Sequence, residues 1–269
     1  MQESMSLGNR YEVKLNDITK EWEYFDNGVF IPREKETLYK YITFNENTIA
    51  SLMGCYFWLT NPVSFNDPFD CNKNLIVDYA EDPSEVKWDT RNHFKDIGVA
   101  SFTEEKCHPL MWAHYADNYN GLVVEFDTKI ENFLTKEDRI KNLRWRKVIY
   151  PNYTGPMQKA FPFANEVMLT AKLPYWEYEN EWRLIGDLTN EDNRYVNFHP
   201  SQIKRFYLGY NLVKNNSSAF QILVGIRDKN YPHAEIWWVR PSSNRYGSYD
   251  IKKFDIDGID KIEYPDNPL

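Results

Sequence analysis

The sequence predicts an α+β fold in which mixed or antiparallel sheets are flanked by helices. Three observations predict this class. Segments with strand-like alternation arrive in pairs, helical segments do not alternate strictly with them, and no G-x-G-x-x-G or Walker loop is present. A doubly wound parallel sheet is therefore not expected. The 269 residues fit one principal domain over residues 36–269, and the polar, charge-mixed residues 1–35 are expected to form an arm ahead of it.

The individual elements follow from hydrophobic periodicity and from helix-end signals. Asn45 or Asn47 can cap a short helix, and Gly54 stands where a left-handed residue would end it. The predicted strands cover residues 37–44, 56–60, 96–103, 121–126, 176–188, 203–210 and two segments within 234–256. The predicted helices cover residues 45–55, part of 78–95, 109–120, part of 155–172 and 211–228.

The composition argues against two large classes of partner. A formal net charge of -8 and a pI of about 5.3 disfavour general binding to duplex DNA, because phosphate neutralisation requires a basic face. Residues 139–150 are basic and leave two interpretations open. Either Arg144 and Arg146 hold a nucleic-acid strand with Trp145 stacked between them, or the segment is an ordinary solvated face. The longest apolar runs fall far short of a membrane span, so we expect a soluble, cytoplasmic protein.

The cysteines do not indicate a disulfide framework or a metal site. Cys55, Cys71 and Cys107 are odd in number and widely spaced, which is typical of reduced thiols. No C-x-x-C pair is present, so no metal is expected. Aromatic residues make up 16% of the chain, and most of them are expected to fill the core while a minority could stack on a flat ligand.

The stretch "SFNDPF" predicts a tight polar turn between two phenylalanines. Asn66 and Asp67 can cap nearby backbone N–H groups, and Pro68 restricts the residue before it. In one interpretation this capping is the whole role of the polar side chains. In the other, Phe65 and Phe69 fix the turn at a ligand site, where Asn66 or Asp67 contacts a ligand hydroxyl.

The stretch "LMWAHYAD" predicts a helix with chemically distinct faces. Helical spacing places Met111, His114 and Tyr115 on one face and Trp112 with Tyr119 on another. A lone histidine on such a face is more often a core residue than a catalyst, and core packing is also the expected role of Trp112. Tyr115 could form a stacking wall for a base or a nicotinamide ring.

The stretch "WEYENEWRLI" is predicted to be a strand with three carboxylates on one face. Alternation places Glu177, Glu179 and Glu181 together, and such carboxylates repel one another unless positive charge faces them. Arg183 continues the acidic face, and Lys172 lies shortly upstream. Either these residues form a paired network, or two of the glutamates are active-site carboxylates.

The motifs "LTNPVSFNDPFDC", "MWAHYAD" and "YENEWRL" follow one another in this order and resemble the bacterial DUF2971 family, whose function is not established. The resemblance covers residues 38–255. It implies no activity.

A second resemblance is to the ADP-ribosyltransferase fold, which has a split sheet around NAD. The opening strand with Lys40, a ring at Tyr115 and the E-x-E of Glu179 and Glu181 are similar to that plan. Lys40 stands where that fold usually has Arg or His, and "ASFT" with Ser101 stands in place of Ser-Thr-Ser. The resemblance implies an NAD-dependent ADP-ribosyltransferase or NAD glycohydrolase, and a toxin or an antiphage effector is the biological role that it suggests.

The resemblance also implies roles for individual residues. Glu181 would stabilise the oxocarbenium-like ribose and Glu179 would orient the acceptor. The residues expected to contact NAD are Lys40, Tyr41, Asn66, Asp67, Ser101, His114, Tyr115 and Arg183.

Two other functions stay open at this point. One is a metal-dependent nuclease or phosphoesterase, and the other is a non-catalytic module that binds a ligand or a partner. The first would use Asp67, Asp70, Lys172, Glu179 and Glu181. The partners expected from all these interpretations are NAD or another nucleotide, a protein or nucleic-acid acceptor, and a partner or inhibitor protein.

Overall fold

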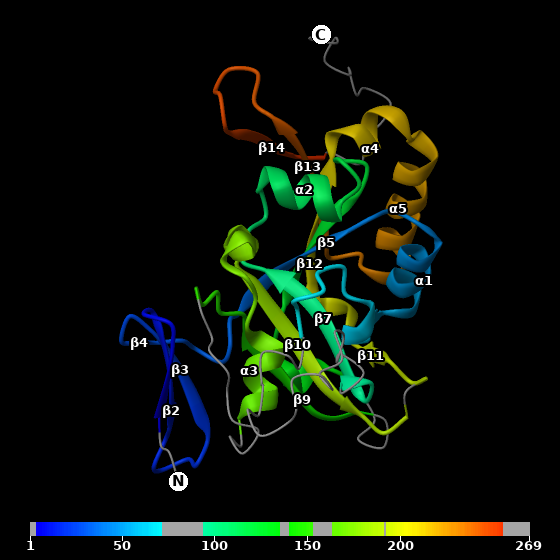
Figure 1. The fold of residues 1–269 in the computed structure, drawn as a ribbon. Helices are drawn as coiled ribbons and strands as arrows, with labels where there is room; N and C mark the ends of the chain where they lie inside the picture. The colour runs from blue at the N-terminus through cyan, green and yellow to red at the C-terminus, as the bar shows by residue number, and fades with distance from the viewer. Residues whose placement is uncertain (1–3, 72–93, 135–139, 153–162, 191, 255–269) are drawn as a thin grey trace. The chain divides into compact units, whose positions relative to one another are not determined.

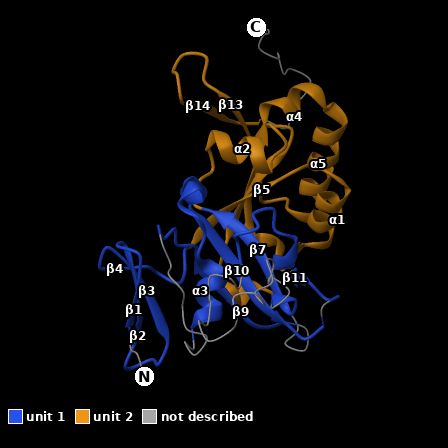
Figure 2. Cartoon of the chain, in the orientation of Figure 1, with its two compact units in different colours: residues 1–35, 58–103, 135–196 blue, residues 36–57, 104–134, 197–269 orange. Residues whose placement is uncertain are grey.

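A computed structural model describes residues 4–71, 94–134, 140–152, 163–190 and 192–254 (Figure 1). The predicted helix within 78–95 lies almost wholly outside these residues. The chain forms two compact units (Figure 2). Unit 1 comprises residues 1–35, 58–103 and 135–196, and unit 2 comprises residues 36–57, 104–134 and 197–269. Helices and both antiparallel and parallel strand pairs are present, so the predicted α+β class with mixed sheets is confirmed.

Unit 1 begins with a four-stranded antiparallel sheet where the sequence predicts an arm. Its strands pair in the order β1-β2-β3-β4. They cover Ser4–Leu7, Tyr11–Leu15, Trp22–Asp26 and Val29–Phe30. The difference has a packing cause, because the few apolar residues of this polar segment, including Leu7, Val13 and Tyr24, join the hydrophobic core of unit 1.

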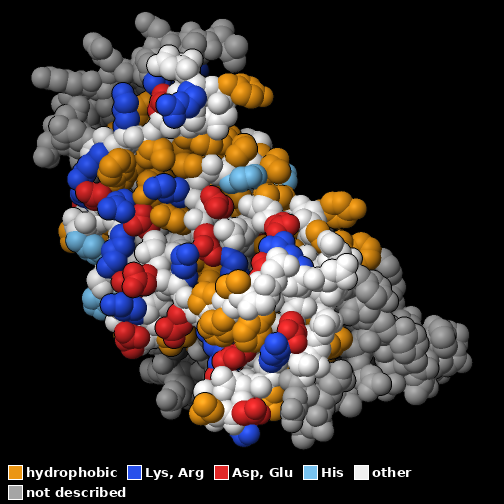
Figure 3. Space-filling view, turned by 90° about the vertical axis from the view of Figure 1, so that its left-hand side faces the viewer, with side chains coloured by type: hydrophobic (Ala, Val, Ile, Leu, Met, Phe, Trp, Pro, Cys, Tyr) orange, Lys and Arg blue, Asp and Glu red, His pale blue; other side chains and the backbone are white. Residues whose placement is uncertain are grey.

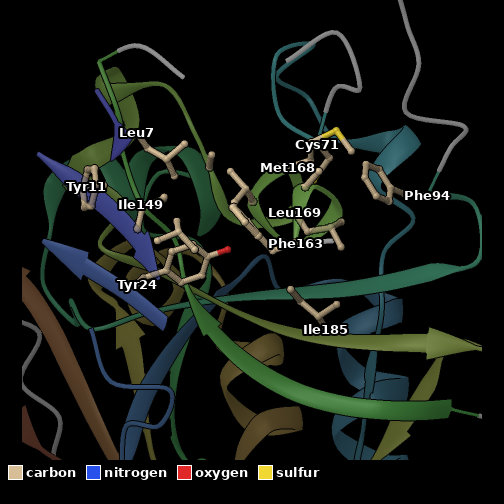
Figure 4. Packing of buried hydrophobic residues seen from close by; sticks show 14 of the residues in the cluster. Leu7, Tyr11, Tyr24, Cys71, Phe94, Ile149, Phe163, Met168, Leu169 and Ile185 are labelled. Atoms are coloured by element: carbon tan, nitrogen blue, oxygen red, sulfur yellow. The ribbon is translucent and has the colours of Figure 1, made fainter. Parts of the chain in front are cut away.

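Three further strands and one helix of unit 1 position the candidate site. Strands β7 (Ile97–Thr103) and β9 (Ile140–Lys147) pair antiparallel with β10 (Glu181–Leu188), which lies between them. Helix α3 (Ala164–Thr170) contributes Val167, Met168 and Leu169 to the core, as Figure 4 shows for the last two. The Tyr24 hydroxyl lies 3.3 Å from Thr170 Oγ1, which joins the N-terminal sheet to this helix.

Unit 2 contains five strands in the order β14-β13-β12-β8-β5. Strands β12 and β13 are parallel, and the other neighbouring pairs are antiparallel. The strands cover Thr37–Ile42 (β5), Leu122–Asp127 (β8), Ile203–Gly209 (β12), Glu235–Pro241 (β13) and Tyr249–Lys253 (β14). Two short strands, Tyr56–Trp58 (β6) and Tyr195–Asn197 (β11), complete the described set.

The helices of unit 2 end at positions that differ slightly from the prediction. Asn45 caps α1 (Glu46–Gly54) by accepting a hydrogen bond from Thr48 N at 3.0 Å, and the left-handed residue is Cys55 rather than Gly54. Helix α2 covers Pro109–Tyr115 and stops before Asn120, because residues 117–119 are all left-handed. The single helix predicted over 211–228 is broken at Asn216. Its two parts are α4 (Tyr210–Asn215) and α5 (Ser217–Asn230).

Charged side chains of both signs are interspersed on the molecular face that Figure 3 shows. Lys and Arg do not gather there into one basic patch, as the net charge of -8 leads one to expect. Every helix within the described ranges is too short or too polar to cross a membrane.

Candidate functional site

The candidate site of unit 1 is a buried group of five charged side chains, which we call the Glu181 cluster. Two of its members are cations and three are carboxylates. Glu181 is 3% exposed and Arg183 is 0% exposed, and the other members are also buried. The members are Asp70, Lys172, Glu179, Glu181 and Arg183. The predicted paired network around the E-x-E motif is therefore confirmed.

Arg183 is the centre of this cluster. Its Nη1 and Nη2 donate to the two oxygens of Asp70 at 3.0 and 2.6 Å, and its Nε and Nη2 donate to the two oxygens of Glu181 at 2.9 and 3.2 Å. Nη1 also donates to Leu169 O at 2.7 Å, which satisfies a carbonyl in the last turn of α3. A guanidinium has five N–H donors, so all of them are used inside the protein.

Lys172 closes the other side of the cluster. Its Nζ lies 2.5 Å from Glu179 Oε2, 3.3 Å from Glu181 Oε2 and 4.0 Å from Asp70 Oδ2. The same ammonium lies 4.8 Å from the centroid of the Trp176 ring, which adds a cation–π contact. All three carboxylates of the cluster therefore face Lys172.

The backbone that carries the two glutamates differs from the predicted strand. Residues Pro174–Glu179 form a 3-10 helix, and β10 begins only at Glu181. Proline favours the first turn of a helix, and Asn180 ends it in the left-handed conformation at φ 44°. Glu177 consequently leaves the acidic face and pairs with Arg10 of the N-terminal sheet. The prediction that Glu177, Glu179 and Glu181 share one strand face is wrong.

Two hydroxyl groups fix the ends of this segment. Thr103 Oγ1 donates to Glu179 O at 2.5 Å, and the Tyr150 hydroxyl accepts from Glu181 N at 2.8 Å. Because one backbone group is anchored on β7 and the other on Tyr150, which follows β9, the two glutamate side chains have little freedom to separate. Burial raises the pKa of Tyr150, so its hydroxyl remains protonated.

The "SFNDPF" turn meets the acidic strand through Asp70. Asn61 caps a short 3-10 helix, Pro62–Ser64, ahead of the turn. Asp67 Oδ1 accepts from Phe69 N at 2.9 Å, and Asp67 O accepts from Asp70 N at 3.1 Å, so the predicted capping is present. This geometry directs the Asp70 carboxylate to Arg183. The Arg183 Cζ also lies 5.4 Å from the Phe65 ring centroid.

Asp70 and Lys172 belong to the cluster, although the ADP-ribosyltransferase resemblance assigned neither a role. Asp70 is the last carboxylate of the turn motif, and Lys172 is the nearest cation before the E-x-E motif. In the sequence, these positions were the only local signals that Asp70 and Lys172 belong to the site. No spacing rule connects Asp70 to Arg183, which follows 113 residues later.

The ionisation states of the cluster are set by competition between burial and pairing. Burial alone would raise the pKa of Glu181, but Arg183 and Lys172 lower it to about 2. Burial would likewise lower the pKa values of Lys172 and Arg183, but the surrounding carboxylates raise both. Pairing therefore keeps Glu181 ionised and Lys172 and Arg183 protonated at neutral pH.

Ser101 connects this buried group to the surface. Its hydroxyl hydrogen-bonds the Glu181 carboxylate, which contributes to the low pKa of Glu181, and Ser101 itself is exposed. Ser101 stands opposite Arg183 in the β7–β10 register. A ligand that approaches Ser101 therefore comes next to the Glu181 carboxylate.

The low pKa of Glu181 predicts a pH dependence of stability. The unfolded chain takes up a proton on this group near pH 4.5, whereas the folded chain resists protonation until about pH 2. The stabilisation is therefore complete above pH 4.5 and is lost as the pH falls towards 2. Urea unfolding at a series of pH values should show a steep loss of stability in this range for the wild type and a shallower loss for Glu181→Gln. Parallel curves for the two proteins would contradict the prediction.

The candidate residues of unit 2 lie on β5 and α2. Tyr41 on β5 is buried, its hydroxyl accepts from His108 N at 3.3 Å, and burial raises its pKa. Lys40 Nζ lies 6.0 Å from the Phe57 ring centroid. On α2, His114 is exposed and Tyr115 is half-buried, with their ring centroids 6.1 Å apart. Their roles in NAD binding stay predictions.

Trp112 is a core residue, as expected. It is fully buried, stacks on Tyr119 with ring centroids 5.2 Å apart and planes at 7°, and contacts the edge of Tyr41. The face of α2 that carries Trp112 therefore packs within unit 2.

The basic segment 139–150 does not have the geometry of a stacking site for nucleic acid. Trp145 is buried in β9 and packs edge-on against Phe102 at 4.9 Å. Arg144 pairs with Glu166 and Asp187, and Arg146 pairs with Glu166. The strand alternation turns Trp145 to the face opposite the two arginines, so the predicted interleaved stack is wrong.

Among the residues that the structure describes, no three His, Cys, Asp or Glu side chains are arranged to hold a metal ion. The oxygens of Asp70 and Glu181, which a metal site would need, accept from Arg183 instead.

Comparison with known proteins supports one of the two resemblances. A family model described as "Protein of unknown function (DUF2971)" matches residues 111–184, a segment that includes most of α2 and the cluster residues Lys172, Glu179, Glu181 and Arg183. No curated protein and no solved structure matches the chain. Over residues 111–184, the chain is therefore similar to the DUF2971 family.

Proposed function

We propose that unit 1 carries the reaction centre of an NAD-consuming enzyme, an ADP-ribosyltransferase or an NAD glycohydrolase, with Glu181 as its central carboxylate. The observation that supports the proposal is the charge of the Glu181 cluster. The five described members of the cluster are three carboxylates and two cations, and Glu181 hydrogen-bonds the exposed Ser101. Their formal charges sum to -1, beside a surface residue.

This charge suits the chemistry of glycosidic cleavage. The bond between ribose C1′ and the nicotinamide nitrogen breaks, its electron pair leaves with nicotinamide, and positive charge develops on the ribose. A unit negative charge 4 Å away stabilises such a cation by about 4 kcal/mol at an effective dielectric constant of about 20. A carboxylate that is fixed and already ionised needs no reorganisation when the charge develops.

The proposal assigns a distinct role to each member of the site. Glu181 and Ser101 face the ribose, and Glu179 orients the acceptor, which is water or a side chain or base. Arg183 holds Glu181 ionised and in place. It is not assigned the contact with NAD that the resemblance implies, because its five N–H donors are used inside the protein and it is 0% exposed. A role as a toxin or antiphage effector depends on this activity and stays a prediction.

The burial of Arg183 and Glu181 also favours a second function. A fully satisfied arginine and a glutamate that is 3% exposed are also typical of a network that only stabilises a fold. Unit 1 would then belong to a non-catalytic module that binds a ligand or a partner. In that case Glu181→Gln lowers stability and changes no turnover.

Release of nicotinamide tests the two functions. The wild-type protein is incubated with NAD, alone and with protein or oligonucleotide acceptors, and free nicotinamide is measured by chromatography with and without a chelator. We expect release that resists the chelator and falls at least 100-fold in Glu181→Gln, within the range for loss of one electrostatic contact. Ser101→Ala is expected to reduce the rate about tenfold and to keep the wild-type melting temperature.

Glu125→Gln is the matched control. Glu125 is a buried glutamate of unit 2 that pairs with Arg205 and with the Tyr207 hydroxyl, and it has no role in the proposal. It should keep the wild-type rate of release. Absence of release under all conditions would favour the non-catalytic module, and release that the chelator abolishes would contradict a mechanism in which Glu181 acts without a metal ion.

A further inference from the structure

Asp67 is a buried carboxylate that the turn uses only in part. It is 7% exposed, and its Oδ1 accepts from Phe69 N at 2.9 Å. Its Oδ2 is enclosed and has no hydrogen-bond partner. Asp70, three residues later, contrasts with it, because both Asp70 oxygens accept from Arg183.

The turn itself does not explain the second oxygen. Capping of Phe69 N needs one acceptor, which a serine or asparagine side chain also supplies. A buried acceptor without a partner costs free energy, and such groups are rare in folded proteins. The second Asp67 oxygen therefore keeps its capacity to accept a hydrogen bond from a donor outside the turn.

The surroundings of Asp67 indicate what kind of donor this is. Asn66, Pro68 and Phe69 are exposed, so the turn that carries Asp67 lies at the surface of the protein. The Phe69 side chain is 48% exposed, and an aromatic ring can pack on the apolar face of a sugar. A carboxylate oxygen beside such a ring is suited to accept from a sugar hydroxyl.

The turn is also attached to the Glu181 cluster. Asp70 is bound to Arg183, and the Phe65 ring lies over the same guanidinium. A ligand held by Asp67 is therefore bound by a segment whose far end contacts the residue that holds Glu181 in place.

We propose that Asp67 Oδ2 accepts a hydrogen bond from a ribose hydroxyl and that residues 65–70 form the sugar-recognition turn of unit 1. The inference rests on the proposed function, because it assigns the ligand as a ribose-bearing nucleotide. Asp67 positions the sugar and takes no part in bond breaking.

Binding of ADP-ribose tests the proposal without turnover. Isothermal titration calorimetry is carried out on the wild type, Asp67→Asn and Asp67→Ser, each checked for folding by circular dichroism. Both substitutions keep an acceptor for Phe69 N and remove the second carboxylate oxygen. We expect each to weaken ADP-ribose binding at least tenfold, which corresponds to about 1.4 kcal/mol, with the wild-type fold retained.

Asp127→Asn is the matched control. Asp127 also caps a backbone N–H group, that of Lys129, but its other oxygen is paired with Lys204 at 3.5 Å. It should bind ADP-ribose as the wild type does.

The outcomes separate this proposal from the proposed function. Wild-type ADP-ribose affinity in Asp67→Asn or Asp67→Ser, or no ADP-ribose binding by the wild-type protein, would overturn the sugar-recognition turn. Binding that depends on Asp67 without nicotinamide release would support the turn and contradict the NAD-consuming activity. Nicotinamide release by the wild type, together with unchanged ADP-ribose binding in the variants, would support the NAD-consuming activity and contradict the sugar-recognition turn.

Discussion

Arg183→Met is expected to lower the free energy of unfolding by about 3–5 kcal/mol, the range for removal of one partner from a buried ion network. The substitution leaves Asp70 and Glu181 buried with only Lys172 to face them, and it leaves Leu169 O without its donor. Methionine fills a similar volume, so the loss is mainly electrostatic. Chemical denaturation followed by tryptophan fluorescence or circular dichroism measures it.

Arg240→Met provides the comparison. Arg240 pairs with Asp250 at 3.3 Å in unit 2, and both side chains are partly exposed. Exposed pairs of this kind contribute about 0–1 kcal/mol, because water screens the charges and the side chains lose entropy when they pair. If Arg183→Met destabilised the protein no more than Arg240→Met does, the Glu181 cluster would have to be hydrated and only weakly coupled.

Gly209→Ala is expected to destabilise the protein by about 3 kcal/mol or more, at the upper end for an overpacked core. A Cβ at this position would lie 2.1 Å from the Tyr119 carbonyl oxygen, which is backbone and cannot rotate away. That carbonyl also accepts from Leu212 N at 3.0 Å, and residues 117–119 already have left-handed backbones. A shift of Tyr119 would therefore break the start of α4 and strain the turn after α2.

Gly225→Ala is the opposite case within the same unit. Gly225 lies inside α5, and a Cβ there meets no atom within 4 Å. Because glycine disfavours a helix interior by about 0.5–1 kcal/mol relative to alanine, this substitution should stabilise the protein by that amount. The two glycine variants should thus shift the melting temperature in opposite directions. Equal shifts would show that close approach at Gly209 does not control stability.

The local features of the fold could be predicted because they depend on a few neighbouring residues. The strand of residues 37–42 follows from alternation, and the cap at Asn45 follows from a side chain that reaches the first turn of its own helix. The Asp67 cap within "SFNDPF" has the same origin. The need for cations around Glu179 and Glu181 was predictable as well, because like charges cannot be buried together unpaired.

Other features could not be predicted because they depend on contacts far apart in the chain. Residues 1–35 are polar enough to suggest an arm, yet their few apolar side chains join the core with α3. Residues 174–179 have a strand-like alternation, but Pro174 and a left-handed Asn180 favour a helical turn instead. Trp145 stands between two arginines in the sequence, and strand pairing places it in the core.

By itself, the sequence determined the α+β class, the acidic character of the chain, the polar turn and the pairing of the E-x-E glutamates with nearby cations, since periodicity, net charge and short-range capping act over a few residues. Only the tertiary structure decided that Asp70 binds Arg183, that Ser101 reaches Glu181 from the surface and that one Asp67 oxygen is left without a partner. These three facts depend on which strands and turns pack together, because burial and hydrogen-bond satisfaction are properties of the packed chain.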